Sequence, residues 1–289
     1  MTWGIAVGGT VSLDNVTTPG GLRSEQIGGS AVYFALAASP VATVHLVGAV
    51  GRDGVDAANA ALAGSGVDLD GLEVSDQPTR RWTATHDFET WQTRRDERAD
   101  EGVYTTWSPR LTPAAAGAEM LFLGSMHPLQ QLAMLEQSSA RFVGSDSMVA
   151  HIGEDSAGVE QVATSSDILF LNRAELASLT RSDPDGWEDA ARSLIGRGRL
   201  RAVVVKAGPL GAALVTAGRI AALNAHPVSR VLDPTGAGDS LAGGMLGACA
   251  AQGRVDDEFL LGALDAGLRR AATCISAYGV AALVASSAG

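Results

Sequence analysis

The sequence predicts an α/β fold in which helices cover both faces of a mostly parallel central sheet. Short apolar runs of strand length alternate with alanine-rich helical stretches along most of the 289 residues. This alternation is typical of βαβ units, whose strands are buried on both faces. Hydrophobic residues make up 46% of the chain and charged residues 18%, so the chain can bury one large core.

The elements follow one another in a regular order. The expected strands are the runs Gly4–Val7, Val44–Val47, Met120–Leu123, Arg141–Gly144, Ile168–Leu171, Ala202–Val205 and Ala212–Val215. The expected helices are Ala31–Ala38, Val55–Ala63, Gln130–Ser138, Ser156–Thr164 and Trp187–Arg197, followed by two long ones at about Ser240–Gln252 and Asp256–Ala277. No internal repeat interrupts this order, and we expect a single domain over residues 1–289.

One segment departs from the βα pattern. Residues Thr79 to Trp107 alternate polar with aromatic or β-branched residues, which predicts a small antiparallel set of strands projecting from the main sheet. Such an insertion could cover a substrate cleft, pair two subunits, or do both. The charged run of residues 94–101 within it is expected to be a solvated turn.

Charge and cysteine content exclude several classes of protein. The formal net charge of −11 argues against a nucleic-acid or anionic-membrane binder, although one local site could still hold a phosphate. The two cysteines, Cys249 and Cys274, cannot form a disulfide framework and are expected to be buried in helices. The N-terminus reads as a first strand, and no run of residues is typical of a membrane span, so we expect a soluble, cytoplasmic protein.

The strongest chemical signal is the stretch DPTGAGDS at residues 233–240, directly before a helix. Its two glycines let the backbone approach a ligand closely, and the amides of a helix N-terminus attract a phosphate or a developing anion. Asp239 lies at the same point, where a carboxylate could either cap the helix or accept a proton from a bound hydroxyl. By physical argument alone both interpretations stay open.

Four motifs, in order along the whole chain, resemble the ribokinase family, also called the PfkB carbohydrate kinases. DPTGAGDS resembles the C-terminal signature of that family, and GGSA at 28–31 followed by LVGAVGRDGVD at 46–56 resembles its other signature. NRAE at 172–175 matches its N-x-x-E motif, and KAGPLG at 206–211 resembles its nucleotide turn. The resemblance implies a ribokinase-like three-layer α/β/α fold with a small β lid, formed by segments at about 10–26 and 79–107.

The resemblance implies a reaction and its catalytic residues. It indicates an ATP- and Mg²⁺-dependent kinase that transfers the γ-phosphate to a hydroxyl of a sugar, nucleoside or related polyol. Asp239 would be the general base, and the amides of Gly236, Ala237 and Gly238 would form the anion hole. Positioning and charge neutralisation of this kind are what phosphoryl transfer requires.

The nucleotide side follows from the same resemblance. Glu175, with Asn172, would organise Mg²⁺, in part through water. The residues expected to line the nucleotide are Asn172, Glu175, Lys206, Gly208, Gly211 and Thr235. Lys206 is the single lysine of a chain whose other basic side chains are all arginine, which favours a role for its ammonium group. A monovalent-cation site near the anion hole and a homodimer formed through the lid occur in parts of the family.

The acceptor side departs from the family pattern. Gly28 and Gly29 fit a close backbone approach to a sugar, and Asp14 is placed to accept hydrogen bonds from a vicinal diol. Tyr33 stands where the family commonly has Asn, and His127 follows a strand where relatives have Asn and an acidic residue. A further expected Asn is Val149. These changes predict ordinary kinase chemistry on a changed acceptor, with the substrate contacted by Asp14, Gly28, Gly29, Tyr33 and His127.

Two other functions fit parts of the sequence. A ribokinase-like protein that binds a metabolite without turnover would explain the changed acceptor residues, but the intact GAGD loop argues against it. A dinucleotide-dependent oxidoreductase would suit the βαβ pattern, but the first strand is not followed by G-x-G-x-x-G.

Overall fold

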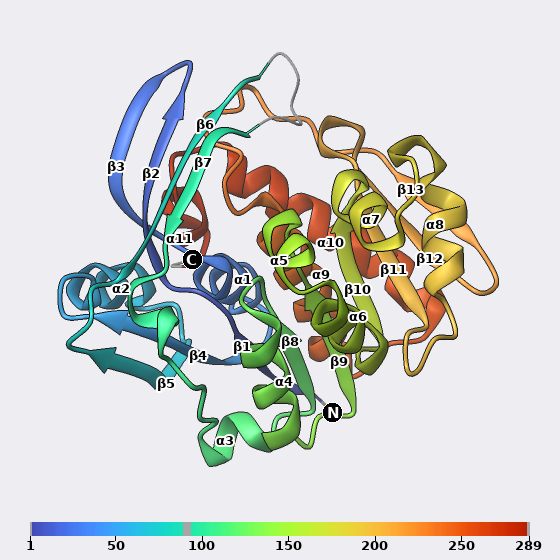
Figure 1. The fold of residues 1–289 in the computed structure, drawn as a ribbon, viewed down its shortest axis with the longest axis horizontal. Helices are drawn as coiled ribbons and strands as arrows, with labels where there is room; N and C mark the ends of the chain where they lie inside the picture. The colour runs from blue at the N-terminus through green and yellow to red at the C-terminus, as the bar shows by residue number, and fades with distance from the viewer. Residues whose placement is uncertain (1, 89–93, 288–289) are drawn as a thin grey trace.

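A computed structural model describes residues 2–88 and 94–287. Helices lie on both faces of a central sheet, and a second, smaller sheet stands at one side of it (Figure 1). The three-layer α/β/α architecture and the small sheet predicted from the sequence are therefore confirmed. No helix within the described ranges is long and apolar enough to span a bilayer.

The central sheet has nine strands. Across the sheet they are β13 (Ile220–Leu223), β12 (Ala212–Thr216), β11 (Ala202–Lys206), β10 (Ile168–Asn172), β9 (Phe142–Asp146), β8 (Met120–Leu123), β1 (Gly4–Gly8), β4 (Thr43–Gly51) and β5 (Asp68–Ser75). The strands from β11 to β5 run parallel, whereas β12 and β13 form an antiparallel edge. All seven predicted strands are present, each within four residues of its expected ends.

Alternation along the strands divides the core between the two faces. On β8, Met120 and Phe122 point into one cluster, and Leu121 and Leu123 point into another. Because successive side chains of a strand face opposite sides, a run that is apolar throughout must be covered on both. The near-continuous apolar strands of this chain therefore require helices on both faces of the sheet.

The helices complete the two outer layers. One face carries α1 (Ser30–Ala38), α2 (Val55–Leu62), α9 (Ala237–Gln252), α10 (Asp257–Ile275) and α11 (Ala281–Ser287). The other carries α3 (Pro113–Ala116), α4 (Pro128–Gln137), α6 (Ser156–Ser165), α7 (Arg173–Thr180) and α8 (Trp187–Leu194), with α5 (Val149–Glu154) beside α6 and α7. Cys249 and Cys274 are buried, as expected, on α9 and α10.

The small sheet joins two distant parts of the chain. Its order is β3 (Gly21–Gly28), β2 (Ser12–Thr18), β6 (Arg80–His86) and β7 (Arg94–Asp100). The β2–β3 and β6–β7 pairs are antiparallel, but β2 and β6 run parallel, so the sheet is mixed rather than antiparallel. The prediction of strands in 79–107 is confirmed, and the sheet also recruits residues 12–28.

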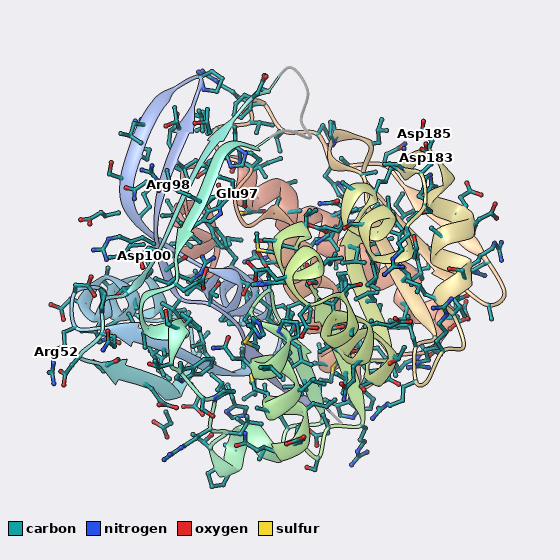
Figure 2. All side chains as sticks on the ribbon, in the orientation of Figure 1. Arg52, Glu97, Arg98, Asp100, Asp183 and Asp185 are labelled. Carbon is teal, nitrogen blue, oxygen red and sulfur yellow. The ribbon has the colours of Figure 1, made fainter. Side chains whose placement is uncertain are left out.

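Two predictions of local structure were wrong. The charged run at 94–100 is strand β7 rather than a turn; Glu97, Arg98 and Asp100 are exposed on it (Figure 2), because an edge strand tolerates charge that a buried strand would not. The helix expected from Ser240 begins at Ala237, so the GAGD motif forms its first turn.

The packing of α1 against α9 joins an early and a late part of the chain on one face of the central sheet. Both helices are nearly all apolar or small, and α9 contains three glycines that face α1 or α10. A β-carbon at Gly243 would lie against the carbonyl oxygen of Phe34 and 2.9 Å from the Ala37 β-carbon. The close approach of the two backbones therefore depends on the missing side chain.

Replacing Gly243 with Ala should destabilise the protein by roughly 1–3 kcal/mol, because the backbones of α1 and α9 must separate to admit the methyl group. Gly262→Ala on α10 is the matched control, since nothing lies within 4 Å of its new β-carbon. That variant should be neutral or more stable by up to about 1 kcal/mol. Chemical denaturation of both variants measures the difference, and equal stabilities would contradict this account of the α1–α9 contact.

Candidate active site

A cavity of about 170 Å³ lies where the carboxyl ends of the central strands meet the small sheet. In open α/β sheets this edge is where ligands bind. The lining residues are Thr10, Ser12, Asp14, Gly29, Ser30, Tyr33, Arg80, Trp82, His86, Ser125, Asp146, Ser147, Met148, Glu175, Lys206, Pro234, Thr235, Gly236, Ala237, Gly238 and Asp239. They come from both sheets and from the N-terminus of α9, so the cavity exists only in the assembled fold.

The N-terminus of α9 opens directly into this cavity. Gly236 is the N-cap residue, with a φ of 75° that few other residues adopt, and Asp239 is the third residue of the helix. A β-carbon on Gly236 would collide with the ring of Tyr33. Glycine is therefore required at position 236 for two reasons: its positive φ and the space that the Tyr33 ring occupies. The arrangement leaves a helix N-terminus, with its amide donors and positive end of the dipole, facing the cavity.

The buried Asp233 holds the loop before α9 in place. Its side chain is 1% exposed and accepts hydrogen bonds from the amide of Thr235 at 2.9 Å and the amide of Gly279 at 3.1 Å. The thiol of Cys274 also donates to the carbonyl oxygen of Thr235, at 3.3 Å. The loop is thus anchored to the C-terminal end of α10 and the turn that follows it.

Lys206 lies at the end of β11 between two buried carboxylates. Its Nζ donates to Asp146 Oδ2 at 2.7 Å and lies 3.8 Å from Glu175 Oε2. Burial disfavours the charged ammonium, but the two carboxylates outweigh it and raise the pKa of Lys206. Burial also raises the pKa of Asp146 to about 7, against the opposing effect of the Lys206 charge. A β-carbon on Gly238 would lie 3.2 Å from Nζ, so the ammonium sits beside the first turn of α9.

Glu175 is positioned by a capping box at the start of α7. Asn172 accepts a hydrogen bond from the Glu175 amide at 2.9 Å, and Glu175 Oε2 accepts one from the Asn172 amide at 2.7 Å. The N-x-x-E motif therefore has a structural role, and it also fixes a carboxylate that is 4% exposed at the wall of the cavity.

The carboxylates at this wall suit a divalent cation that also binds nucleotide phosphates. Asp146 and Glu175 share the single ammonium of Lys206, so negative charge exceeds positive charge there. Mg²⁺ is commonly held by one or two carboxylates together with phosphates and water. Within residues 2–88 and 94–287, no group of three or more His, Cys, Asp or Glu side chains is arranged to hold a metal ion by itself.

Asp14 lines the cavity from β2 of the small sheet. Its side chain is 3% exposed, and Ser12 Oγ donates to its Oδ1 at 2.7 Å. Burial raises the pKa of Asp14 to about 7, while the bond from Ser12 and the charge of Arg80 oppose the rise. A β-carbon on Gly28 would collide with this carboxylate, which explains the first glycine of the GGSA motif.

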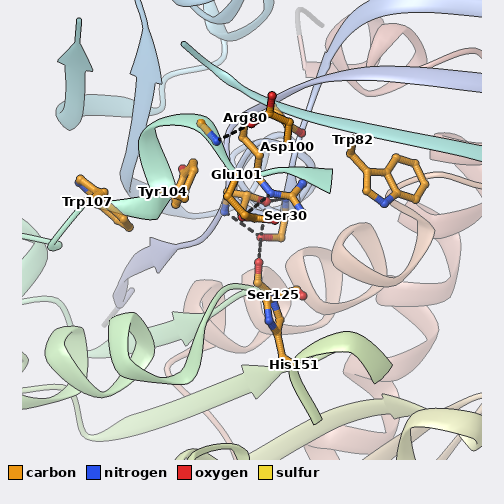
Figure 3. Close-up of polar contacts among 12 residues, drawn as sticks. Ser30, Arg80, Trp82, Asp100, Glu101, Tyr104, Trp107, Ser125 and His151 are labelled. Atoms are coloured by element: carbon orange, nitrogen blue, oxygen red, sulfur yellow. Dashed lines mark hydrogen bonds and ion pairs between the residues drawn. The ribbon is translucent and has the colours of Figure 1, made fainter. Parts of the chain in front are cut away.

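Several hydroxyl groups line the same cavity. Ser30 Oγ donates to the carbonyl oxygen of Ser125 at 3.2 Å (Figure 3). It also lies 3.3 Å from Thr10 Oγ1. Ser125 and Ser147 also line the cavity, and their buried hydroxyl oxygens have no hydrogen-bond partner in the described part of the chain. Buried hydroxyls of this kind are suited to a ligand that both donates and accepts hydrogen bonds.

The structure gathers most of the predicted site residues in this one cavity. Those that line it are Asp14, Gly29, Tyr33, Glu175, Lys206, Thr235, Gly236, Ala237, Gly238 and Asp239. Those outside its lining are Gly28 and Asn172, which support Asp14 and Glu175, and Gly208, Gly211 and His127. His127 is the N-cap of α4, where its Nδ1 accepts a hydrogen bond from the Leu129 amide at 3.3 Å.

Several lining residues were missed from the sequence. Arg80, Trp82 and His86 alternate along β6 and share its inner face, so the period of two in the segment RRWTATH was the available signal. The carboxylate of Asp146 was missed because the strand was expected to end at Gly144, whereas β9 extends to Asp146 and carries its side chain to the sheet edge.

The family model described as pfkB family carbohydrate kinase matches residues 13–288 of the chain. The chain belongs to this family. The pfkB carbohydrate kinases are phosphotransferases, so this family membership also identifies the protein as one. A search of curated protein sequences found no match.

Solved structures of similar fold agree with membership of the pfkB family. A ribokinase from Cryptococcus neoformans var. grubii serotype A in complex with ADP is 20% identical with a TM-score of 0.77, covering 98% of this chain and 97% of that one. A putative ribokinase II from E. coli in complex with ATP and Mg²⁺ is 20% identical with a TM-score of 0.75, covering 96% and 94%. A Burkholderia thailandensis nucleoside kinase in complex with inosine is 18% identical with a TM-score of 0.73, covering 95% and 92%.

The raised pKa of Asp14 predicts a pH-dependent stability. The folded protein holds the Asp14 proton up to about pH 7, whereas the unfolded chain loses it near pH 4, so ionisation of Asp14 costs stability as the pH rises between these values. Asp14→Asn removes this cost. Its melting temperature should exceed that of the wild type by roughly 2–6 °C at pH 8, and the gain should shrink toward pH 5.

Asp53→Asn is the control, because the pKa of Asp53 is lowered whereas that of Asp14 is raised. Asp53 accepts hydrogen bonds from the amide and hydroxyl of Thr79, and these bonds, with Arg81, lower its pKa despite some burial. That variant should melt below the wild type at pH 8. A scanning fluorimetry series from pH 5 to pH 8 would refute the account of Asp14 if Asp14→Asn were destabilised throughout.

Proposed function

We propose that the protein is an ATP-dependent kinase that transfers the γ-phosphate to a hydroxyl of a sugar, nucleoside or related polyol. The observation that carries the proposal is that the N-terminus of α9, with Asp239 in its first turn, opens into the same cavity as the buried carboxylate of Asp14. An anion site, a carboxylate base and a hydroxyl-binding carboxylate are the parts that a hydroxyl-directed phosphoryl transfer needs.

Asp239 acts as the general base in this proposal. A hydroxyl of the acceptor, bound between Asp14 and Asp239, gives its proton to the Asp239 carboxylate as its oxygen attacks the γ-phosphorus. The amides of Gly236, Ala237 and Gly238 would stabilise the charge on the oxygens of the transferring group. The Ala237 amide would exchange its 3.3 Å hydrogen bond to the carbonyl oxygen of Pro234 for one to that group. The β–γ bridging oxygen leaves with ADP.

The nucleotide side would be formed by Glu175 and Lys206, close to the loop that contains Thr235. ATP supplies the phosphoryl group, and Mg²⁺ neutralises charge on its phosphates when both are bound. Glu175 would hold the ion, in part through water, while Lys206 offers its ammonium to the phosphates from beside Gly238. Asp146 holds that ammonium in place from the other side.

The acceptor side favours a small polyhydroxylated molecule. Asp14 would accept hydrogen bonds from a vicinal diol, and the hydroxyls of Ser125 and Ser147 would pair with further hydroxyl groups. The part of the small sheet that lines the cavity, which carries Arg80, Trp82 and His86, forms the roof of the acceptor pocket. Within this roof, Trp82 would offer an apolar face to the ring of the acceptor. The two similar structures of a ribokinase and of a nucleoside kinase with inosine fit an acceptor of this class.

The proposal extends to the organisation of the protein. We treat residues 1–289 as a single kinase domain whose lid is formed by segments at about 10–26 and 79–107, which contain the small sheet. The lid would also pair two subunits in a cytoplasmic homodimer. Light scattering after size-exclusion chromatography tests the dimer, and assays with and without potassium test a monovalent-cation requirement.

The proposed reaction is tested by ADP release from Mg·ATP over a panel of pentoses, hexoses, nucleosides and cyclitols. Asp239→Asn should lower kcat on the best acceptor by about 10²- to 10⁴-fold, because it removes the general base but keeps the shape of the side chain. Asp56→Asn is the matched control, since Asp56 also lies in the first turn of a helix, α2, but away from the cavity.

The outcome separates the proposal from its alternative. Acceptor-dependent ADP release that is lost in Asp239→Asn and kept in Asp56→Asn supports the kinase and identifies its substrate class. Unchanged turnover in Asp239→Asn, with both variants folded, would contradict the role of Asp239. Binding of panel compounds and of ATP without any ADP release would instead support a protein that senses a metabolite.

A further inference from the structure

A histidine of the small sheet reaches the loop that precedes α9. His86 Nε2 lies 3.0 Å from Thr235 Oγ1, and the two residues are 149 positions apart in the sequence. Both side chains line the cavity. The contact therefore connects the roof of the acceptor pocket to the loop whose amides face the transferring phosphoryl group.

The direction of the His86 side chain follows from the strand that carries it. Arg80, Trp82 and His86 alternate along β6 and all line the cavity, so they share the inner face of the strand. Trp82 is paired in register with Asp14 on the neighbouring strand β2. The inner face thus carries the proposed diol-binding carboxylate, the indole above the acceptor and, at its far end, the imidazole.

A second contact joins the same two regions. The guanidinium of Arg23 on β3 lies over the ring of Tyr278, 4.2 Å from its centroid. The residue after Tyr278 donates its amide to Asp233, which also anchors Thr235. The small sheet is therefore attached at two points, His86 and Arg23, to the contacts that hold residues 233–236. We call these residues, which precede α9, the phosphate loop.

The hydroxyl of Thr235 is not needed to hold its own loop. The amide of Thr235 is bound by Asp233 and its carbonyl oxygen accepts from Cys274, so the backbone is fixed without the side chain. The contact between this hydroxyl and His86 therefore connects the loop to the roof and is not needed for the conformation of the loop.

We propose that His86 is a positioning residue that fastens the roof of the acceptor pocket to the phosphate loop through Thr235. The inference rests on the proposed kinase function and adds to it. With the roof fastened, the acceptor hydroxyl is held over the α9 N-terminus and water is kept from the γ-phosphate. Loss of the contact leaves the base and the anion hole in place but lets water compete with the acceptor.

Hydrogen exchange tests the contact without any knowledge of the acceptor. In the full chain without ligands, Thr235→Val should raise the exchange of the β6 amides by about 2- to 10-fold, as expected for the loss of one hydrogen bond. The same substitution made in His86→Ala should raise it no further, because the contact is already absent. Thr235→Ser, which keeps the hydroxyl, should exchange as the wild type does.

Turnover tests the function of the contact on the best acceptor from the panel. His86→Ala and Thr235→Val should each lower kcat/KM for the acceptor by about 3- to 10-fold, and the double variant should be no worse than either. The fraction of ATP hydrolysed rather than transferred should rise in all three. Thr85→Ala is the control, since Thr85 is the neighbouring residue of β6 and does not line the cavity.

The two measurements keep this inference separate from the proposed function. A panel that yields no product refutes the kinase, while the exchange data still decide whether His86 holds the roof. Additive effects of the two substitutions, in exchange or in kcat/KM, would overturn the inference. So would an ATP hydrolysis fraction equal to that of the wild type in an otherwise active His86→Ala enzyme.

Discussion

The site depends on the way the loop before α9 is held at the edge of the central sheet. Asp233 is buried and accepts hydrogen bonds from two amides, one in the loop and one beyond α10. The ring of Tyr33 occupies the space that a side chain at Gly236 would need. These contacts fix the first turn of α9 at the wall of the cavity. A helix N-terminus held in a fixed position suits an anion, and a fixed position is what the proposed stabilisation of a transferring phosphoryl group requires.

Parallel strands bring the other groups to the same edge. Lys206, Asp146 and the N-cap of α7 all lie at the carboxyl ends of neighbouring strands, although they are far apart in sequence. The small sheet completes the cavity, because the side chains of Asp14, Trp82 and His86 on its inner face form part of the lining. In the proposed function, Lys206 and Glu175 at the central sheet serve the nucleotide, and Asp14 and Trp82 of the small sheet serve the acceptor.

The sequence allowed the layered fold and the glycine-rich loop before α9 to be predicted because both leave local signals. The apolar runs of β8 and β10 read as strands, and the glycines of GAGD mark a close backbone approach. The pairing of Lys206 with Asp146 left no such signal, since it depends on the register of β9 and β11 on either side of β10. The start of α9 was missed by three residues because glycine disfavours a helix interior, whereas at Gly238 the first turn needs room for the lysine.

We infer that phosphoryl transfer takes place at the first turn of α9, from ATP to an acceptor hydroxyl whose proton goes to the carboxylate of Asp239. A crystal structure with Mg²⁺, ADP, aluminium fluoride and the acceptor found by the panel would test it most directly, because the fluoride takes the place of the transferring group. We predict a fluoride held by the amides of residues 236–238, in line between ADP and an acceptor hydroxyl that is hydrogen-bonded to Asp239. An acceptor hydroxyl held by another residue, or a fluoride bound away from the α9 N-terminus, would contradict the account.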